Sequence, residues 1–195
     1  YGRDLGREAG QLGELLDALS GIDRIRWLRL HYAYPHGLPK GLLEQLAGNP
    51  KVVPYLDIPL QHASGPMLKA MRRGVTREGQ ERILDRIRTH VPDLTVRTTF
   101  IVGFPGETDA DFAELCDFVE KQQFDHVGVF TYYQEEGTPA ATLPDQVPEE
   151  VKDARLQALQ KLLREQQIAF NESKIGHTVA VLVTGRGRLE GQAHG

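Results

Sequence analysis

Four stretches of the chain either alternate apolar with polar residues or run apolar, as β-strands do: residues 24–34, 52–58, 95–102 and 126–132. Between them, leucine, isoleucine, valine and phenylalanine recur every three or four residues, which is the spacing of one buried helical face. These helical patterns begin near Leu12, Leu42, Ile83 and Phe112. Such alternation of helix and strand with short connections predicts an α/β fold, in which the strands form one parallel sheet and the helices pack against it.

Capping residues stand where the helical patterns begin. Thr76 precedes the third main pattern, and Thr108 with Asp111 three residues later matches a capping box for the fourth. Farther along, Pro148 predicts the first position of a long helix that carries acidic residues in its first turn. The apolar stripe of this helix consists of Leu156, Leu159, Leu162 and Leu163.

The pattern changes towards the end of the chain. Residues 135–147 are polar, rich in proline and glycine, and predict a loop. Residues 178–184 (TVAVLVT) predict a strand that does not belong to the preceding α/β domain. We therefore divide the chain into an α/β domain, a connecting helix and the start of an incomplete small β domain, at residues 1–147, 148–174 and 175–195. Four strands are too few to close an eight-stranded barrel, so we expect a half-barrel that is the C-terminal part of a larger domain.

Composition restricts the possible partners and ligands. The 195 residues include 23 basic and 27 acidic ones, a formal charge of -4, which gives no general field for nucleic acid or an anionic membrane. No apolar run approaches the roughly 20 residues of a membrane span, and we expect a cytoplasmic protein. The single cysteine, Cys116, excludes an internal disulfide and a self-contained iron–sulfur or zinc thiolate site, so no metal ligand is assigned. Its place in a helical apolar stripe favours a packing role.

The segment from 97 to 108, RTTFIVGFPGET, predicts a strand, a binding turn and the start of a helix. Gly103 and Gly106 allow a ligand to approach the backbone closely, and the helix presents unpaired N–H groups. In parallel α/β folds ligands bind beyond the carboxyl ends of the strands. We therefore expect this turn to meet the tips of the neighbouring strands, which carry Gln61 and Tyr132.

Several side chains at these tips have the chemistry of a binding site. Gln61 both donates and accepts hydrogen bonds, as an amino acid or an adenine edge requires. Arg72 and Arg73, expected on a following short helix, could pair with a carboxylate, although a solvated helix face is the commoner explanation for each arginine taken alone. Tyr132 is either a core residue or a ring beneath adenine. His62 is expected to make a structural hydrogen bond, and no nucleophile motif identifies a catalytic residue.

Five ordered segments resemble the MiaB/RimO family of radical S-adenosylmethionine methylthiotransferases: YGRDLG, IRWLRLHYAYP, DIPLQHASGPMLKAMRRG, RTTFIVGFPGET and VGVFTYYQEEGTPA. The RimO type resembles this chain in YG-x-DL, DIPLQHAS and EEGTPA. The MiaB type tends to show YGQNV, a PxQSGS form and RPGTPA at the same places. The resemblance covers nearly the whole chain.

The resemblance implies a partial TIM-type radical-SAM half-barrel and a reaction that adds a methylthio group to the β-carbon of an aspartate in protein S-twelve of the small ribosomal subunit. It also implies S-adenosylmethionine and two [4Fe–4S] clusters as cofactors. Comparison with the superfamily places Gln61 and Arg73 around the methionine and ribose. The strand that carries Thr99, Ile101, Gly103 and Glu107 would lie beside the adenine. Tyr132 would also lie there if its ring packs beneath the adenine and not in the core.

The chain departs from the family in lacking the CxxxCxxC motif, because Cys116 is its only cysteine. We therefore expect a fragment of the enzyme that is inactive by itself. The end of the chain resembles the start of a TRAM domain, a small β-barrel that contacts RNA or, in the RimO type, the protein substrate. Two alternatives stay open, which are a MiaB-type tRNA adenosine methylthiotransferase and a non-catalytic module that binds ribosome or RNA.

Overall fold

The computed structural model describes residues 12–35, 37–178, 183, 185–186 and 193–194. The described helices are α1 (Leu12–Ser20), α2 (Leu42–Gly48), α3 (Gly65–Ala70), α4 (Arg77–His90), α5 (Asp109–Gln122) and α6 (Glu149–Ser173), with a 3-10 turn η2 (Pro139–Thr142). The described strands are β1 (Leu28–Leu30), β2 (Val52–Asp57), β3 (Thr95–Val102), β4 (His126–Thr131), β5 (Gly185–Arg186) and β6 (Ala193–His194).

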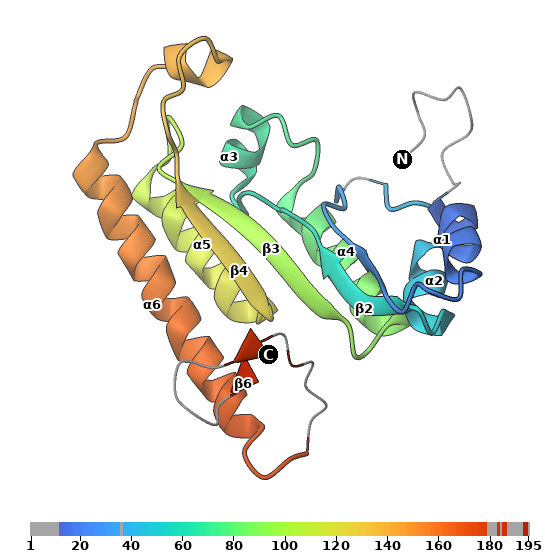
Figure 1. Ribbon diagram of the computed structural model, residues 1–195. Helices are drawn as coiled ribbons and strands as arrows, with labels where there is room; N and C mark the ends of the chain where they lie inside the picture. Colours follow the sequence, from blue (N-terminus) through green and yellow to red (C-terminus); the bar gives the residue numbers. More distant parts are fainter. Residues whose placement is uncertain (1–11, 36, 179–182, 184, 187–192, 195) are drawn as a thin grey trace.

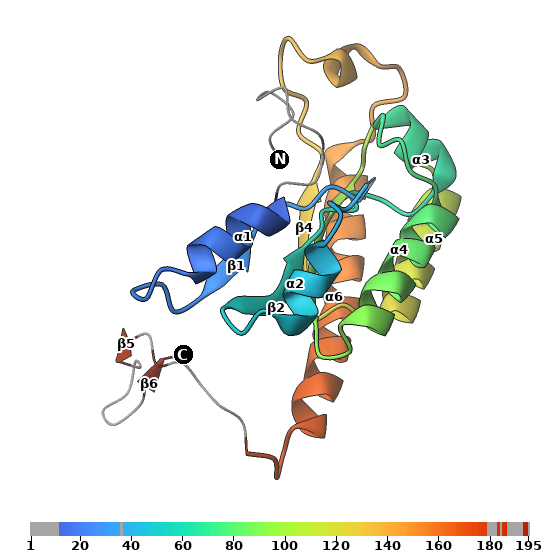
Figure 2. The same cartoon turned by 90° about the vertical axis from the view of Figure 1, so that its right-hand side faces the viewer.

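Strands β1 to β4 form one parallel sheet in chain order, which confirms the predicted α/β fold. Figure 1 shows the sheet with α4 and α5 behind it, and Figure 2 shows the same helices along one side. Each connection between neighbouring strands passes through a helical segment, so all four carboxyl ends lie at one edge. Helix α3 and the turn η2 lie beyond that edge, at the top of Figure 1.

The core lies between the sheet and its helices, and β3 shows how the sequence places it there. Every second residue of β3 is buried, ending with Phe100 and Val102, while the residues between them are only partly buried. Phe100 meets Phe118 of α5 and Phe124 edge-on, with ring centroids 6.3 and 5.9 Å apart. A strand period of two thus sends one set of side chains to the helices and leaves the other set for the opposite face.

Helix α6 packs beside α5 and β4, as its apolar stripe predicts. Leu159 is fully buried, and the other three leucines of the stripe are partly buried against the core. The start of the helix differs from the prediction by one position. Pro148 has ψ 148°, an extended conformation, and is therefore the N-cap of α6, while Glu149 and Glu150 occupy the first turn.

Two further predictions need correction. Strand β1 spans three residues instead of 24–34, because a turn hydrogen bond from Ile25 N–H to the Ile22 carbonyl precedes it and Tyr32 follows it with φ 58°. Helix α3 ends at Ala70, and Arg72 has a φ of 54°. Arg72 and Arg73 therefore lie in the turn after the short helix instead of on it.

The predicted strand at 178–184 lies almost entirely outside the described residues. Near the end of the chain, β5 and β6 pair antiparallel over two residues each. The TRAM-like domain and the three domain boundaries thus stay predictions. Within the described part of the chain, no helix is both long and apolar enough to cross a membrane.

Both predicted helix caps are present. The Thr76 side chain accepts a hydrogen bond from Gly79 N–H at 3.2 Å. At α5, Thr108 and Asp111 form a reciprocal capping box, in which the Asp111 carboxylate accepts from Thr108 N–H at 3.0 Å. The second Asp111 oxygen accepts from the buried Ser64 hydroxyl, so the cap also ties α5 to the segment that follows β2.

We predict that Asp111→Asn lowers stability by about 1–3 kcal/mol at pH 7, because the amide keeps one acceptor oxygen and leaves either Ser64 or Thr108 without its partner. Burial raises the pKa of Asp111, but hydrogen bonds from Ser64 and Thr108 outweigh it and leave the pKa below its ordinary value. The carboxylate therefore stabilises the fold above its unfolded pKa of about 3.9, and this contribution is lost as the pH falls through the lower folded value. Urea unfolding from pH 7 to 3 should show the gap between wild type and variant shrinking; a constant gap would contradict this.

Candidate functional site

The tip of β2 is joined to the end of β3 by two backbone hydrogen bonds. Gln61 N–H donates to the Thr99 carbonyl at 2.8 Å, and Ile101 N–H donates to the Gln61 carbonyl at 2.9 Å. Gln61 adopts a φ of 73°, the left-handed region that non-glycine residues rarely occupy. This pairing beyond the regular end of β2 fixes the Gln61 backbone beside Ile101, so the PLQH and GFPG segments lie on the same side of the molecule.

A cavity of about 490 Å³ lies at the carboxyl ends of the strands. Its walls come from the tip of β2, the turn after α3, the ends of β3 and β4, and the loop that follows β4. The lining includes Gln61, Arg72, Arg73, Ile101, Phe104 and Tyr132. The strand tips converge on one cavity, as the parallel sheet predicts.

The cavity combines an apolar wall with polar atoms that have no protein partner. Phe104 and Tyr132 pack edge to face, with ring centroids 5.2 Å apart, and Ile101 lies on the same lining. Among the described residues, the buried side-chain atoms Gln61 Oε1, Arg73 Nε and Tyr132 Oη make no hydrogen bond. Buried polar atoms are normally paired, so this lining suits a ligand with an apolar ring and several donors and acceptors.

Arg73 joins three segments around the cavity. Its Nη2 donates to the Pro59 carbonyl at 2.8 Å, and its guanidinium lies 5.0 Å from the Tyr34 ring centroid. The Tyr34 hydroxyl in turn donates to the Arg73 carbonyl at 2.6 Å. Arg73 therefore anchors the turn after α3 while its Nε keeps a free donor, whereas Arg72 is exposed at the cavity.

The structure divides the seven predicted cofactor-binding residues into two groups. Gln61, Arg73, Ile101 and Tyr132 line the cavity, whereas Thr99, Gly103 and Glu107 do not. Thr99 lies deeper along β3, on the same strand face as Ile101. The buried Glu107 side chain makes its polar contacts within the protein. One of its oxygens accepts from Gly103 N–H at 2.9 Å, and the other lies 2.9 Å from Arg155.

Sequence reasoning missed two parts of the lining. Phe104 lies inside the GFPG turn, and an aromatic residue between two glycines of a predicted binding turn was a signal that its ring lines the cavity. The other part is the loop after β4, whose residues Thr138, Pro139 and Leu143 lie on the cavity. His62, by contrast, behaves as predicted. It is fully buried, and its Nδ1 accepts from Ser64 N–H at 3.0 Å.

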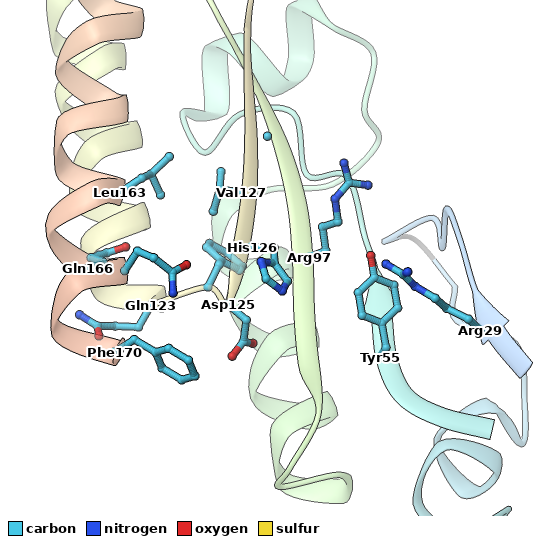
Figure 3. A pocket seen from close by; sticks show the side chains of 13 residues that line it. Arg29, Tyr55, Arg97, Gln123, Asp125, His126, Val127, Leu163, Gln166 and Phe170 are labelled. Atoms are coloured by element: carbon cyan, nitrogen blue, oxygen red, sulfur yellow. The ribbon is translucent and has the colours of Figure 1, made fainter. Parts of the chain in front are cut away.

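A second cavity, of about 480 Å³, lies near the amino ends of β3 and β4 (Figure 3). Strand residues such as Tyr55 and His126 face the end of α6 across it. Its cations are already engaged, since Arg97 pairs with Asp57 at 2.7 Å and the Arg29 guanidinium lies 3.9 Å from the Tyr55 ring centroid. Ligands of parallel α/β folds bind at the opposite edge, so we assign the candidate site to the first cavity.

Metal-binding side chains do not gather in the described part of the chain, where no group of three or more His, Cys, Asp or Glu could hold an ion. Cys116 is half-buried on α5 and packs against the core, as its position in the apolar stripe predicts. Burial raises the pKa of its thiol, and the nearby carboxylates of Glu107 and Glu120 add to the effect. A cluster is held by several cysteine thiolates, whereas this chain has one cysteine and its surroundings disfavour the thiolate form.

The model of the radical SAM superfamily matches residues 5–119. Three curated relatives, each named ribosomal protein uS12 methylthiotransferase RimO, come from Acaryochloris marina, Desulforamulus reducens and Acetivibrio thermocellus. They are 48%, 44% and 48% identical over 99%, 94% and 95% of this chain and over 44%, 41% and 41% of their own lengths. The chain thus spans about two fifths of the length of the curated relatives it matches.

Among solved structures, the fold is similar to that of coproporphyrinogen III oxidase (HemN) from Escherichia coli, described as a radical SAM enzyme. The TM-score is 0.62 at 17% sequence identity, over 82% of this chain and 38% of that chain. At this identity the likeness concerns the fold alone. It agrees with the partial barrel expected from the strand pattern.

We predict that Cys116 reacts slowly with a disulfide reagent such as Ellman's reagent at pH 8. Its raised pKa and partial burial both lower the amount of accessible thiolate. The rate should be at least about tenfold below that of a model cysteine peptide. It should rise to the peptide's rate in urea. A native rate equal to that of the peptide would contradict the packing role.

Proposed function

Because this chain belongs to the radical SAM superfamily, we propose that the cavity at its strand tips binds S-adenosylmethionine in a methylthiotransferase of RimO type. The observation that carries the proposal is the cavity itself. It joins an apolar wall to the unpartnered atoms of Gln61, Arg73 and Tyr132, at the edge where parallel α/β folds bind ligands. These features suit a cofactor with an aromatic base at one end and a charged amino acid at the other.

Each end of the cofactor has a matching part of the lining. Ile101, Phe104 and Tyr132 offer an apolar surface for the adenine. Gln61 and Arg73 offer an amide and a guanidinium for the methionine and ribose, with Arg73 Nε as the free donor. Thr99, Gly103 and Glu107 act in this proposal by shaping the strand tip and turn. The Thr99 carbonyl holds Gln61, and the Glu107 carboxylate holds the Gly103 backbone.

The proposed reaction adds a methylthio group to the β-carbon of an aspartate of ribosomal protein uS12. The names of the relatives, at 44–48% identity, support uS12 as the substrate protein. When bound, the cofactor would supply the methyl group and, after one-electron reduction by a cluster, a 5′-deoxyadenosyl radical that removes the β-hydrogen, while the sulfur atom would come from a separate donor. The residues of this chain hold the cofactor and keep water from it, because a radical that abstracts hydrogen needs a close and dry contact with the substrate.

The iron–sulfur clusters of such an enzyme do not fit the donor set of this chain. Its only cysteine is half-buried on α5 and carries a raised pKa. Under this proposal the ligands of both [4Fe–4S] clusters come from residues outside the 195 of this chain. Contact with RNA or the ribosome is proposed for the segment after α6, on the strength of its TRAM-like sequence alone.

We predict that Gln61→Ala and Arg73→Ala each weaken S-adenosylmethionine binding by the full-length gene product by about tenfold or more, the usual effect of losing a hydrogen bond to a charged group. Isothermal titration calorimetry measures the change. Arg86→Ala is the matched control, because Arg86 is exposed on α4 away from the cavity. Unchanged affinity in both cavity variants, with folding intact, would defeat the site assignment.

For the reaction itself, we predict that deleting the gene removes the methylthio mass from protein uS12 and leaves methylthiolated tRNA adenosine unchanged. Mass spectrometry of intact ribosomal proteins and of digested tRNA from the same cells measures both pools. Loss from the tRNA alone would instead establish the MiaB-type activity. Loss from neither pool would favour a non-catalytic ribosome-binding module.

A further inference from the structure

Two buried, charged side chains of helix α6 contact the turn that carries Phe104 of the proposed cofactor pocket. Lys152 and Arg155 are 3% and 7% exposed, which is unusual for residues of these types. They lie one helical turn apart and contact the turn between β3 and α5. Both lie beyond residues 5–119, the part of the chain matched by the superfamily model.

Lys152 occupies the space that a side chain at Gly103 would need. A Cβ added at Gly103 would overlap Lys152 Cγ and lie 3.1 Å from its Cδ. Gly103 also has a φ of 74°, where an L side chain is strained. The Lys152 ammonium pairs with Glu149 at 2.7 Å and lies 5.4 Å from the Tyr132 ring centroid. The stem of this lysine thus supports the turn and its end approaches one wall of the pocket.

Arg155 fixes the other end of the same turn. Its Nη1 donates to the Glu107 carboxylate at 2.9 Å and to the Glu107 carbonyl at 3.2 Å, and its Nη2 donates to Asp109 at 2.7 Å. The second Glu107 oxygen holds Gly103 N–H and lies 3.3 Å from His62 Nε2. Glu107 is 5% exposed, and these contacts give each of its buried oxygens a donor.

The turn held in this way carries a wall of the pocket. Phe104 lies between Gly103 and Glu107 and packs edge to face against Tyr132. We propose that Lys152 and Arg155 are positioning residues of the pocket, which hold Phe104 and Tyr132 in place through the Gly103–Glu107 turn. The identity of the ligand rests on the proposed function, whereas the positioning of the turn does not.

We predict that Lys152→Ala weakens S-adenosylmethionine binding by the full-length gene product about fivefold to thirtyfold, because the turn and Tyr132 lose their support. Lys152→Met keeps an unbranched stem and should rescue affinity to within about twofold of wild type. Arg155→Met and Glu107→Gln form a double-mutant cycle. The loss of binding free energy in the double variant should be smaller than the sum of the losses in the two single variants. Calorimetry measures binding. Amide hydrogen exchange of residues 100–108 measures the turn without any ligand.

Two controls on the same helix separate positioning from general stability. Lys161→Ala alters an exposed side chain and should change neither affinity nor exchange. Leu159→Ala opens the core and should lower the melting temperature, yet leave affinity unchanged at temperatures where the variant is folded. If Lys152→Ala leaves the exchange of residues 100–108 unchanged, the positioning proposal is wrong. If exchange rises but wild type does not bind S-adenosylmethionine, positioning stands and the proposed function fails.

Discussion

The arrangement of the site depends on one short stretch of parallel pairing beyond the regular end of β2. Two backbone hydrogen bonds join Gln61 to Thr99 and Ile101, and they hold Gln61 in a left-handed conformation that it would not adopt alone. The next segments are positioned from this point. Arg73 reaches back to the Pro59 carbonyl, and Tyr132 N–H donates to the Val102 carbonyl at 2.8 Å on the other side of β3. Three strand tips are thereby fixed around one cavity.

A second constraint is that the two buried carboxylates next to the cavity turn, Glu107 and Asp111, need hydrogen-bond donors. The Glu107 carboxylate is paired with Arg155 and with a backbone N–H, and Asp111 is held by Ser64 and Thr108. Several donors converge on each of these two carboxylates, which favours a single arrangement of the groups around them. These polar contacts therefore fix the position of the Gly103–Glu107 turn relative to α6. On the cavity lining, Gln61 Oε1, Arg73 Nε and Tyr132 Oη are left without protein partners.

Local sequence patterns were sufficient for much of the fold. The period of two in β3 and the capping box of α5 predicted their elements closely, because both depend on neighbouring residues. The predicted length of β1 was wrong, because a turn before the strand and the positive φ of Tyr32 after it limit the strand despite the alternating pattern of residues 24–34. At the site, convergence followed from the parallel sheet. The partner of Glu107 lies 48 residues away in α6, and no local pattern reports such a contact.

The most direct test of the central claim is a crystal structure of the full-length gene product with S-adenosylmethionine. In that structure the adenine should lie against Ile101, Phe104 and Tyr132, with the methionine end beside Gln61 and Arg73. The Gly103–Glu107 turn should keep its contacts to α6. Density for the cofactor at the amino ends of the strands, in the cavity lined by Tyr55 and His126, would show that the strand-tip cavity is not the cofactor site.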